Sequence, residues 1–160
     1  MFALKSYYGN NSPTNNTTSK EWNSKILKCP TDRWLEWRSY LINGWNDYFQ
    51  QKMGVDWKFD KIAGSSMSVS EIPNPTETIL FGEKDTASAH FYMDFLETAA
   101  GNDFEELEHA RHSGLKSAGG SNFAFADGSA RYLKYGRSVT PENLWAVIDS
   151  WRHNTAGIKF

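Results

Sequence analysis

The chain has 160 residues, of which 15% are aromatic and 22% are charged, and its 17 Lys and Arg against 19 Asp and Glu give a formal net charge of -2. This length fits one domain with its own core, so we predict a single domain over residues 1–160. The charge balance provides no basic field for nucleic acid or an anionic membrane surface. The single cysteine, Cys29, excludes an internal disulfide and a cysteine-only metal site. No long apolar run or signal peptide occurs in the sequence, so we expect a soluble chain without a targeting segment.

The first half of the chain predicts a loop followed by short helices and strands. Residues 1–20, rich in Asn, Ser and Thr, cannot bury enough apolar surface to order alone, so we expect a loop or a poorly ordered end. The spacing of Trp22, Ile26 and Leu27 favours a short helix that Pro30 ends. The other elements expected here are a strand around 40–43, a helix over 46–53 with Asn46 as its cap, and a buried strand over 78–81 followed by Gly82 and Glu83.

The second half predicts a strand, a hairpin and two helices. Apolar residues alternate along 89–97 as in a strand, with Phe91, Met93 and Phe95 on one face. Acidic residues begin the segment 104–111 and His and Arg end it, which favours a helix because this order complements the helix dipole. A C-terminal amphipathic helix is predicted from Thr140 as its cap, Pro141 in its first turn and an apolar stripe of Leu144, Trp145, Ile148 and Trp151.

The hairpin is predicted from "NFAFADGSARYL", because Asp127 and Gly128 both tolerate the positive φ of a two-residue type I′ turn. Such a turn pairs Ala126 with Ser129, Phe125 with Ala130 and Phe123 with Tyr132. Short strands interleaved with isolated helices then predict an α+β fold with an antiparallel sheet.

Histidines and acids provide candidate metal ligands. On the predicted helix, Glu105, His109 and His112 share one face, and two imidazoles with a carboxylate suit zinc or iron. The alternative is that these histidines only interact with the helix dipole and that Glu105 and His109 form a surface pair. Four further acids could bind calcium or supply a carboxylate pair for acid–base catalysis; the alternative is that they are solvated loop residues. They are Glu83, Asp85, Asp94 and Asp127.

Nucleophilic catalysis has little support in the sequence. Ser113 and Ser129 lack the G-x-S-x-G setting, and Cys29 has no histidine near it in the sequence, so we predict structural roles for all three. The tryptophans Trp34, Trp37, Trp45 and Trp57 either pack in the core or form an exposed platform for a glycan or a protein partner.

Several weak motifs in a fixed order resemble one family. They are "ILKCPTD" at 26–32, "SYLINGWNDYF" at 39–49, "IPNPTETILFGEK" at 72–84, "RHSG" at 111–114, "GGSNFAFADGSARYLKYG" at 119–136 and "NLWAV" at 143–147. This set resembles the prepilin-type proteins named for a histidine, a nine-residue spacer and Asp-Gly. The matching motif residues are Cys29, Pro30, Glu83, His112, Asp127 and Gly128. Here the spacer has fourteen residues, 113–126, so we expect an enlarged loop around 115–119.

The resemblance implies a type IV pilin or type II secretion pseudopilin head with an antiparallel sheet, without the N-terminal hydrophobic stalk. It implies a non-enzymatic assembly component at the cell envelope, periplasmic or on the cell surface, with other pilin-like subunits or secretion proteins as partners and no catalytic residue or cofactor to transfer. In this interpretation Asp127 and Gly128 are architectural. Two alternatives remain: a module that binds glycan or protein through tryptophans, and a metal-dependent hydrolase using calcium or zinc on His109, His112 and Glu83 or Asp127.

Overall fold

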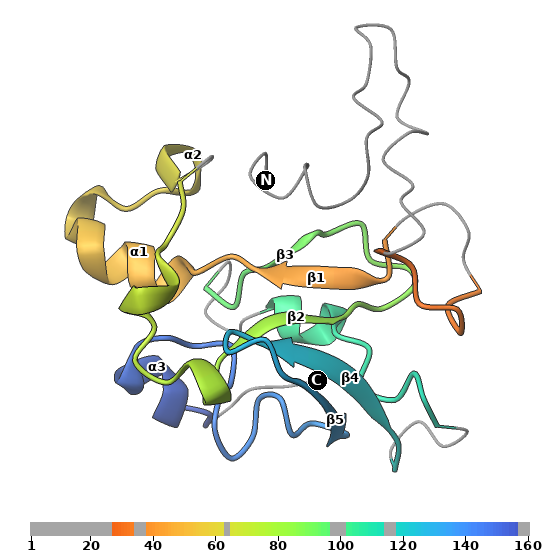
Figure 1. The fold of residues 1–160 in the computed structure, drawn as a ribbon. Coiled ribbons are helices and arrows are strands. Elements are labelled where there is room, and N and C mark those ends of the chain that lie inside the picture. Colours follow the sequence, from red (N-terminus) through yellow and green to blue (C-terminus); the bar gives the residue numbers. More distant parts are fainter. Residues whose placement is uncertain (1–26, 34–37, 63–64, 97–101, 114–117, 157–160) are drawn as a thin grey trace, which may run out of the picture.

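A computed structural model describes residues 27–33, 38–62, 65–96, 102–113 and 118–156 (Figure 1). Five strands form one sheet in the order β3-β1-β2-β4-β5. The strands are β1 (Tyr40–Asn43), β2 (Ile79–Glu83), β3 (Tyr92–Met93), β4 (Gly120–Phe125) and β5 (Ala130–Lys134). The helices are α1 (Asn46–Met53), α2 (Phe59–Ile62) and α3 (Asp149–His153), with short 3-10 turns η4 (Gly54–Asp56), η5 (Val69–Glu71), η6 (Pro75–Glu77) and η7 (Asn102–Glu106). The predicted α+β class is confirmed.

The sheet is mixed, which corrects the prediction of a wholly antiparallel one. β1 with β2, β2 with β4, and β4 with β5 pair antiparallel, but β3 pairs parallel to β1. The chain turns back after β2 and adds β3 on the far side of β1. Since β3 therefore runs opposite to β2, it has the same direction as β1.

The predicted strands around 40–43 and 78–81 and the helix over 46–53 are confirmed as β1, β2 and α1. The predicted cap is wrong: Trp45, at φ 58°, precedes the helix, and Asn46 is its first residue. The Trp45 N–H donates to Oδ1 of Asn43 at 2.9 Å, so the side-chain acceptor before the helix is Asn43 rather than Asn46. The strand expected over 89–97 is confined to β3; of the predicted apolar face, Met93 and Phe95 are buried and Phe91 is half-buried. The helix proposed around Trp22 lies largely outside the described residues.

The hairpin of β4 and β5 is present, but its register differs from the prediction by one residue. Ala124 pairs with Ala130 and Asn122 with Tyr132. Gly128, at φ 87°, has positive φ while Asp127 does not, and the Phe125 N–H donates to the Ser129 carbonyl. The loop therefore contains three residues, Ala126 to Gly128, with glycine in the left-handed position of a bulge, rather than the two of a type I′ turn.

Both long helices predicted in the second half are wrong over most of their length. The segment after η7 runs beside the end of β2: Leu107 bridges Lys84, and the Glu108 N–H donates to the Glu83 carbonyl. Its backbone groups thus find partners in the sheet. Only α3 remains of the C-terminal helix, because Asp47 and Arg152 instead bind backbone groups of the segment 143–148.

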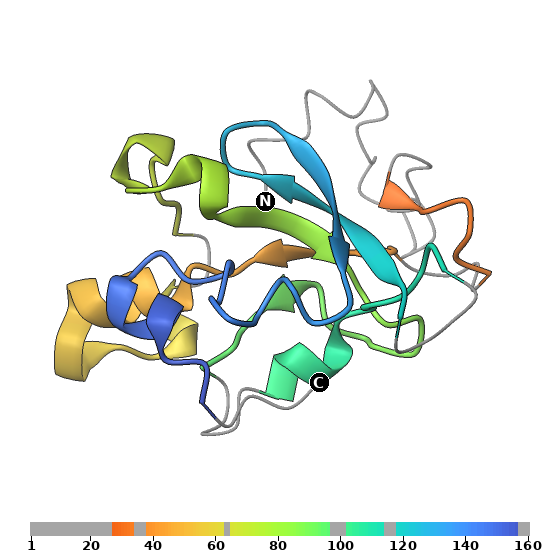
Figure 2. The same ribbon diagram turned by 90° about the horizontal axis from the view of Figure 1, so that it is seen from below.

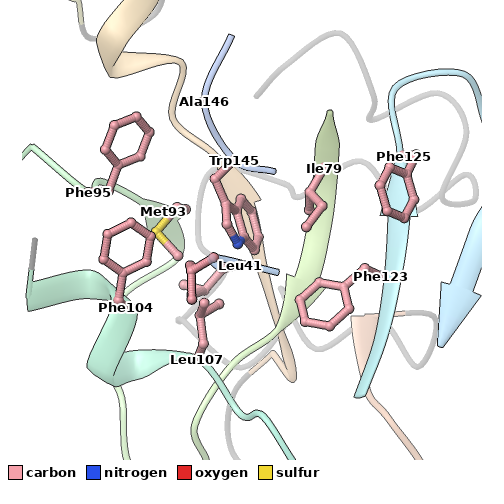
Figure 3. Packing of buried hydrophobic residues seen from close by; sticks show 11 residues of the cluster. Leu41, Ile79, Met93, Phe95, Phe104, Leu107, Phe123, Phe125, Trp145 and Ala146 are labelled. Atoms are coloured by element: carbon pink, nitrogen blue, oxygen red, sulfur yellow. The ribbon is translucent and has the colours of Figure 1, made fainter. Parts of the chain in front are cut away.

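The core lies on one face of the sheet, covered by η7 and by the C-terminal segment, which Figure 2 shows on the same side. Trp145 is fully buried at its centre, with Phe95, Met93 and Phe104 on one side and Ile79, Phe123 and Phe125 on the other (Figure 3). Burial of these rings supplies most of the apolar area that holds the sheet. Within the described ranges, no helix has the length and apolar character to cross a membrane.

Candidate functional site

Three side chains with different chemistry meet at one end of the sheet. The Nε2 atom of His112 lies 2.8 Å from Oε1 of Glu83 and 3.8 Å from Sγ of Cys29. Their ligand atoms all lie within 4.8 Å of one another, and in the part of the chain that the structure describes no other His, Cys, Asp and Glu side chains gather in such a group of three. We call these residues the Cys-Glu-His cluster.

The sheet positions Glu83. As the last residue of β2, it stands opposite Tyr40 of β1 and beside Asn122 of β4, whose N–H donates to Oε2 at 2.9 Å. The preceding residue, Gly82, faces the core under Trp145. Because side chains alternate along a strand, Glu83 lies on the face opposite the core. It is nevertheless fully buried, since the segments carrying Cys29 and His112 cover it.

Cys29 is held by a turn before β1. The Asp32 N–H donates to the Cys29 carbonyl at 3.0 Å, and Pro30 takes the second position of this turn, where its fixed φ is favoured. The Cys29 N–H donates to Oγ of Ser39, whose hydroxyl donates to Asp32. The thiol is 3.0 Å from the Thr31 hydroxyl. A short turn therefore fixes both the backbone and the sulfur of Cys29.

His112 belongs to the segment that follows η7, where it lies in a turn closed by the bond from the Ser113 N–H to the Ala110 carbonyl. The His112 N–H donates to the Gly120 carbonyl at 3.1 Å, so the segment lies against the start of β4. The preceding Arg111 donates to the Lys84 carbonyl and pairs with Asp32, 3.3 Å from Nη1 to Oδ1. Its Nε atom is 3.8 Å from Oε1 of Glu83. Arg111 thus links the cluster to the turn that carries Cys29.

Burial perturbs the titrating groups around the cluster. Burial, reinforced by the nearby Cys29 and Glu83, raises the pKa of Tyr40 to about 12, so this phenol stays protonated. Burial also lowers the pKa of Lys84. Both shifts reflect the partial removal of these two side chains from water, where a charge is stable only beside a compensating charge.

The geometry argues against a nucleophilic triad. In a triad the imidazole uses one nitrogen for the nucleophile and the other for the acid. Here Nε2 of His112 faces both Cys29 and Glu83, so it cannot take a proton from one while donating to the other. Cys29 is also only 3% exposed. The arrangement can hold a His112–Glu83 ion pair or a metal ion.

Of the four ligands considered for a metal-dependent hydrolase, the structure brings together Glu83 and His112. His109 is buried elsewhere, with Nε2 3.3 Å from the Phe104 carbonyl and its ring against Tyr135. Because the predicted helix is absent, His109 and His112 do not share a face. Asp127 is exposed at the tip of the hairpin loop, beyond the end of β4, and does not belong to the cluster.

The other predicted candidates have local roles or lie elsewhere. Asp85 and Asp94 each accept a backbone N–H two residues on. Ser113 lies in a bend, and Ser129 follows the hairpin loop, where its N–H donates to the Asp127 carboxylate. Trp45 and Trp57 are half-buried, and Trp34 and Trp37 lie outside the described residues. Sequence reasoning missed Cys29 as a member of the cluster because its partner His112 is 83 residues away. The signal that could have found it is the joint presence of both in the family motifs.

Comparisons of the chain with protein-family models, with curated proteins and with solved structures each find no match.

Proposed function

We propose that this chain is a pilin-like head domain, a non-enzymatic structural subunit of a type II secretion or type IV pilus-like apparatus at the cell envelope. Its partners in this proposal are other pilin-like subunits. One observation carries it: the separate motifs that resemble the prepilin-type family supply the members of a single contact network around the Cys-Glu-His cluster.

Five of the six motifs contribute to that network, and the sixth, "NLWAV", supplies Trp145 of the core. The "ILKCPTD" segment supplies Cys29 and Asp32, and "SYLING" supplies Ser39 and Tyr40. The "ILFGEK" segment supplies Glu83, and "RHSG" supplies Arg111 and His112. The "GGSNF" segment supplies the Asn122 N–H. Motifs that are far apart in the sequence but meet in one contact network share a structural role. The convergence of these motifs on the cluster therefore supports the resemblance as a shared domain architecture.

The longer spacer is compatible with this architecture. The extra residues fall between His112 and Gly120, whose backbones are joined by a hydrogen bond. The residues of the cluster and of the β4–β5 hairpin all lie outside residues 113–119. Additional residues between two such bonded ends cost little closure entropy, so the departure from nine residues does not count against a pilin-like head.

The test is genetic replacement in the native organism. A strain whose gene lacks the head-coding segment is compared with the unaltered strain for secreted proteins and surface filaments. We expect loss of one or both. In parallel, a photo-crosslinking amino acid at the half-exposed Tyr132 of β5, the last strand of the sheet, should link the protein to pilin-like subunits. The fully buried Trp145 position offers the matched control, which should give no link. Unchanged secretion and filaments, with no pilin-like protein among the cross-links, would contradict the proposal.

A further inference from the structure

We propose that the Cys-Glu-His cluster is a binding site for a thiophilic divalent transition metal ion of the zinc type, held by Cys29 Sγ, Glu83 Oε1 and His112 Nε2. A pilin-like head needs no metal for its structural role, so this inference goes beyond the proposed function and is tested separately. It rests on the geometry of the three donors, on the groups that orient them and on their charge.

The three donors have the types and spacing that zinc requires. Zinc binds thiolate, imidazole and carboxylate together, and its metal–ligand distances place tetrahedral ligand atoms about 3.4–3.6 Å apart. Here Nε2 of His112 is 3.8 Å from Sγ of Cys29 and 2.8 Å from Oε1 of Glu83. Binding therefore requires Nε2 and Oε1 to separate by about half an ångström. The His112 side chain is 25% exposed and can move by that amount.

The convergence on a single nitrogen favours a metal over a proton. A proton on Nε2 of His112 can form a hydrogen bond with Oε1 of Glu83 at 2.8 Å, but Sγ of Cys29 stays 3.8 Å from the same nitrogen. A metal ion accepts lone pairs from all three donors at once. The donors also come from three segments far apart in the sequence, so a local turn does not explain their meeting.

Further groups hold the ligands in orientation, as the outer hydrogen bonds of metal sites do. The Asn122 N–H binds Oε2 of Glu83, which leaves Oε1 directed to the other two donors. The Thr31 hydroxyl lies 3.0 Å from the sulfur and can donate to a thiolate. Arg111 has its own carboxylate in Asp32, with both side chains 5% exposed. This pair leaves one carboxylate and one thiolate to neutralise a divalent ion.

Exposure gives the ion an entry path. Cys29 and Glu83 are buried, whereas His112 lies at the surface, so an ion held among them has one side open to solvent. Three protein ligands and a water molecule complete a tetrahedral zinc site. A fourth protein ligand is therefore unnecessary.

The experiment uses the full chain, stripped with a chelator and titrated with Co²⁺, whose spectrum reports a bound thiolate. We expect one ion per chain, a thiolate-to-cobalt charge-transfer band in the near ultraviolet, and displacement of the ion by Zn²⁺. Because the thiol must lose its proton on binding, affinity should also rise with pH. Near-ultraviolet circular dichroism of the tryptophans reports whether each variant stays folded.

Three variants test the ligands: Cys29→Ser, Glu83→Gln and His112→Gln. Each should weaken Co²⁺ binding by at least about tenfold, and Cys29→Ser should abolish the charge-transfer band. His153→Gln and Glu142→Gln remove an exposed imidazole and an exposed carboxylate outside the cluster and should bind as the wild type does. If Glu83→Gln fails to fold, the other two variants decide. Absence of a stoichiometric ion in the wild type, an unchanged band in Cys29→Ser, or equal loss in His153→Gln overturns the proposal.

Discussion

The backbone of Gly82 lies directly under the indole ring of Trp145. A Cβ atom on Gly82 would be 2.6 Å from Cζ2 of that ring and 2.8 Å from Cδ1 and Cε1 of Phe123. Real Cβ atoms do not approach other heavy atoms so closely. The absence of a side chain in β2 therefore makes room for the largest buried ring of the core, on the strand that carries Glu83 at its end.

We predict that Gly82→Ala destabilises the protein by about 1–3 kcal/mol, because the added methyl group overpacks the centre of the core. Urea unfolding followed by tryptophan fluorescence measures the change. Val69→Ala, at a position 63% exposed, is the control and should stay within about 0.5 kcal/mol of the wild type. An unfolding midpoint for Gly82→Ala equal to that of the control would show that the two rings are not packed against β2 in this way.

We predict that Gly128→Val destabilises by about 1–3 kcal/mol through backbone strain alone. Gly128 has φ 87°, and a Cβ there would meet no heavy atom within 4 Å. The matched variant Gly128→Asn should cost clearly less, because asparagine tolerates positive φ better than a β-branched residue. Thermal unfolding of both variants checks this order, and equal melting temperatures would argue against a left-handed residue in the hairpin loop.

The carboxylate of Asp47 fastens the C-terminal segment to α1. Its Oδ2 atom accepts the N–H groups of Val147 and Ile148 at 2.6 and 2.8 Å, and Asp47 is fully buried. Asp47→Ala leaves buried donors without a partner, so we predict a loss of about 1–3 kcal/mol. Asp47→Asn keeps an acceptor oxygen and should lose less. Urea unfolding measures both, and a greater loss for Asn than for Ala would contradict this assignment.

Stability should fall in mild acid because of His109. Burial lowers the pKa of this histidine, with a smaller opposing effect from the Phe104 carbonyl. The unfolded chain therefore takes up a proton at a higher pH than the folded chain. His109 contributes stability that is present above its unfolded pKa and is lost as the pH falls through its lowered folded pKa.

The measurement is urea unfolding of the wild type and His109→Gln at about pH 7.5 and about pH 5.5, which bracket the ordinary histidine pKa. The wild type should lose more stability between these values than the variant does. Comparing the two removes the contributions of the other groups in the chain, which are the same in both proteins. His153→Gln, at an exposed position, should behave as the wild type. An identical pH dependence in His109→Gln would mean that His109 titrates normally.

Local sequence signals predicted the elements that depend on contacts close in sequence or on burial alone. The alternation at 40–43 and the apolar run before Gly82 gave strands, and "NDYFQQKM" gave a helix, as observed. The Asp-Gly pair identified the turn of the hairpin. It could not give the register, because Asp-Gly suits both a two-residue loop and a three-residue loop with a bulge.

The missed elements depend on contacts distant in sequence. Charge order favours a helix over 104–111, but Leu107 and Glu108 instead bond to the end of β2. The Trp145 stripe looks amphipathic, yet that ring is fully buried, with Met93 on one side and Ile79 on the other in Figure 3, and Arg152 binds the Ala146 carbonyl. The same limit applies to the Cys-Glu-His cluster, because spacing along the chain carries no signal for a contact between segments 83 residues apart.

The hydrogen bond from the His112 N–H to the Gly120 carbonyl joins the backbones on either side of residues 113–119, and the Tyr135 N–H donates to the Gly119 carbonyl at the same point. Because the entropy of closing a loop grows slowly with its length, additional residues between these bonded ends should cost little stability. An epitope tag inserted between residues 114 and 117 should therefore leave folding as before, which offers a handle for imaging the protein in living cells.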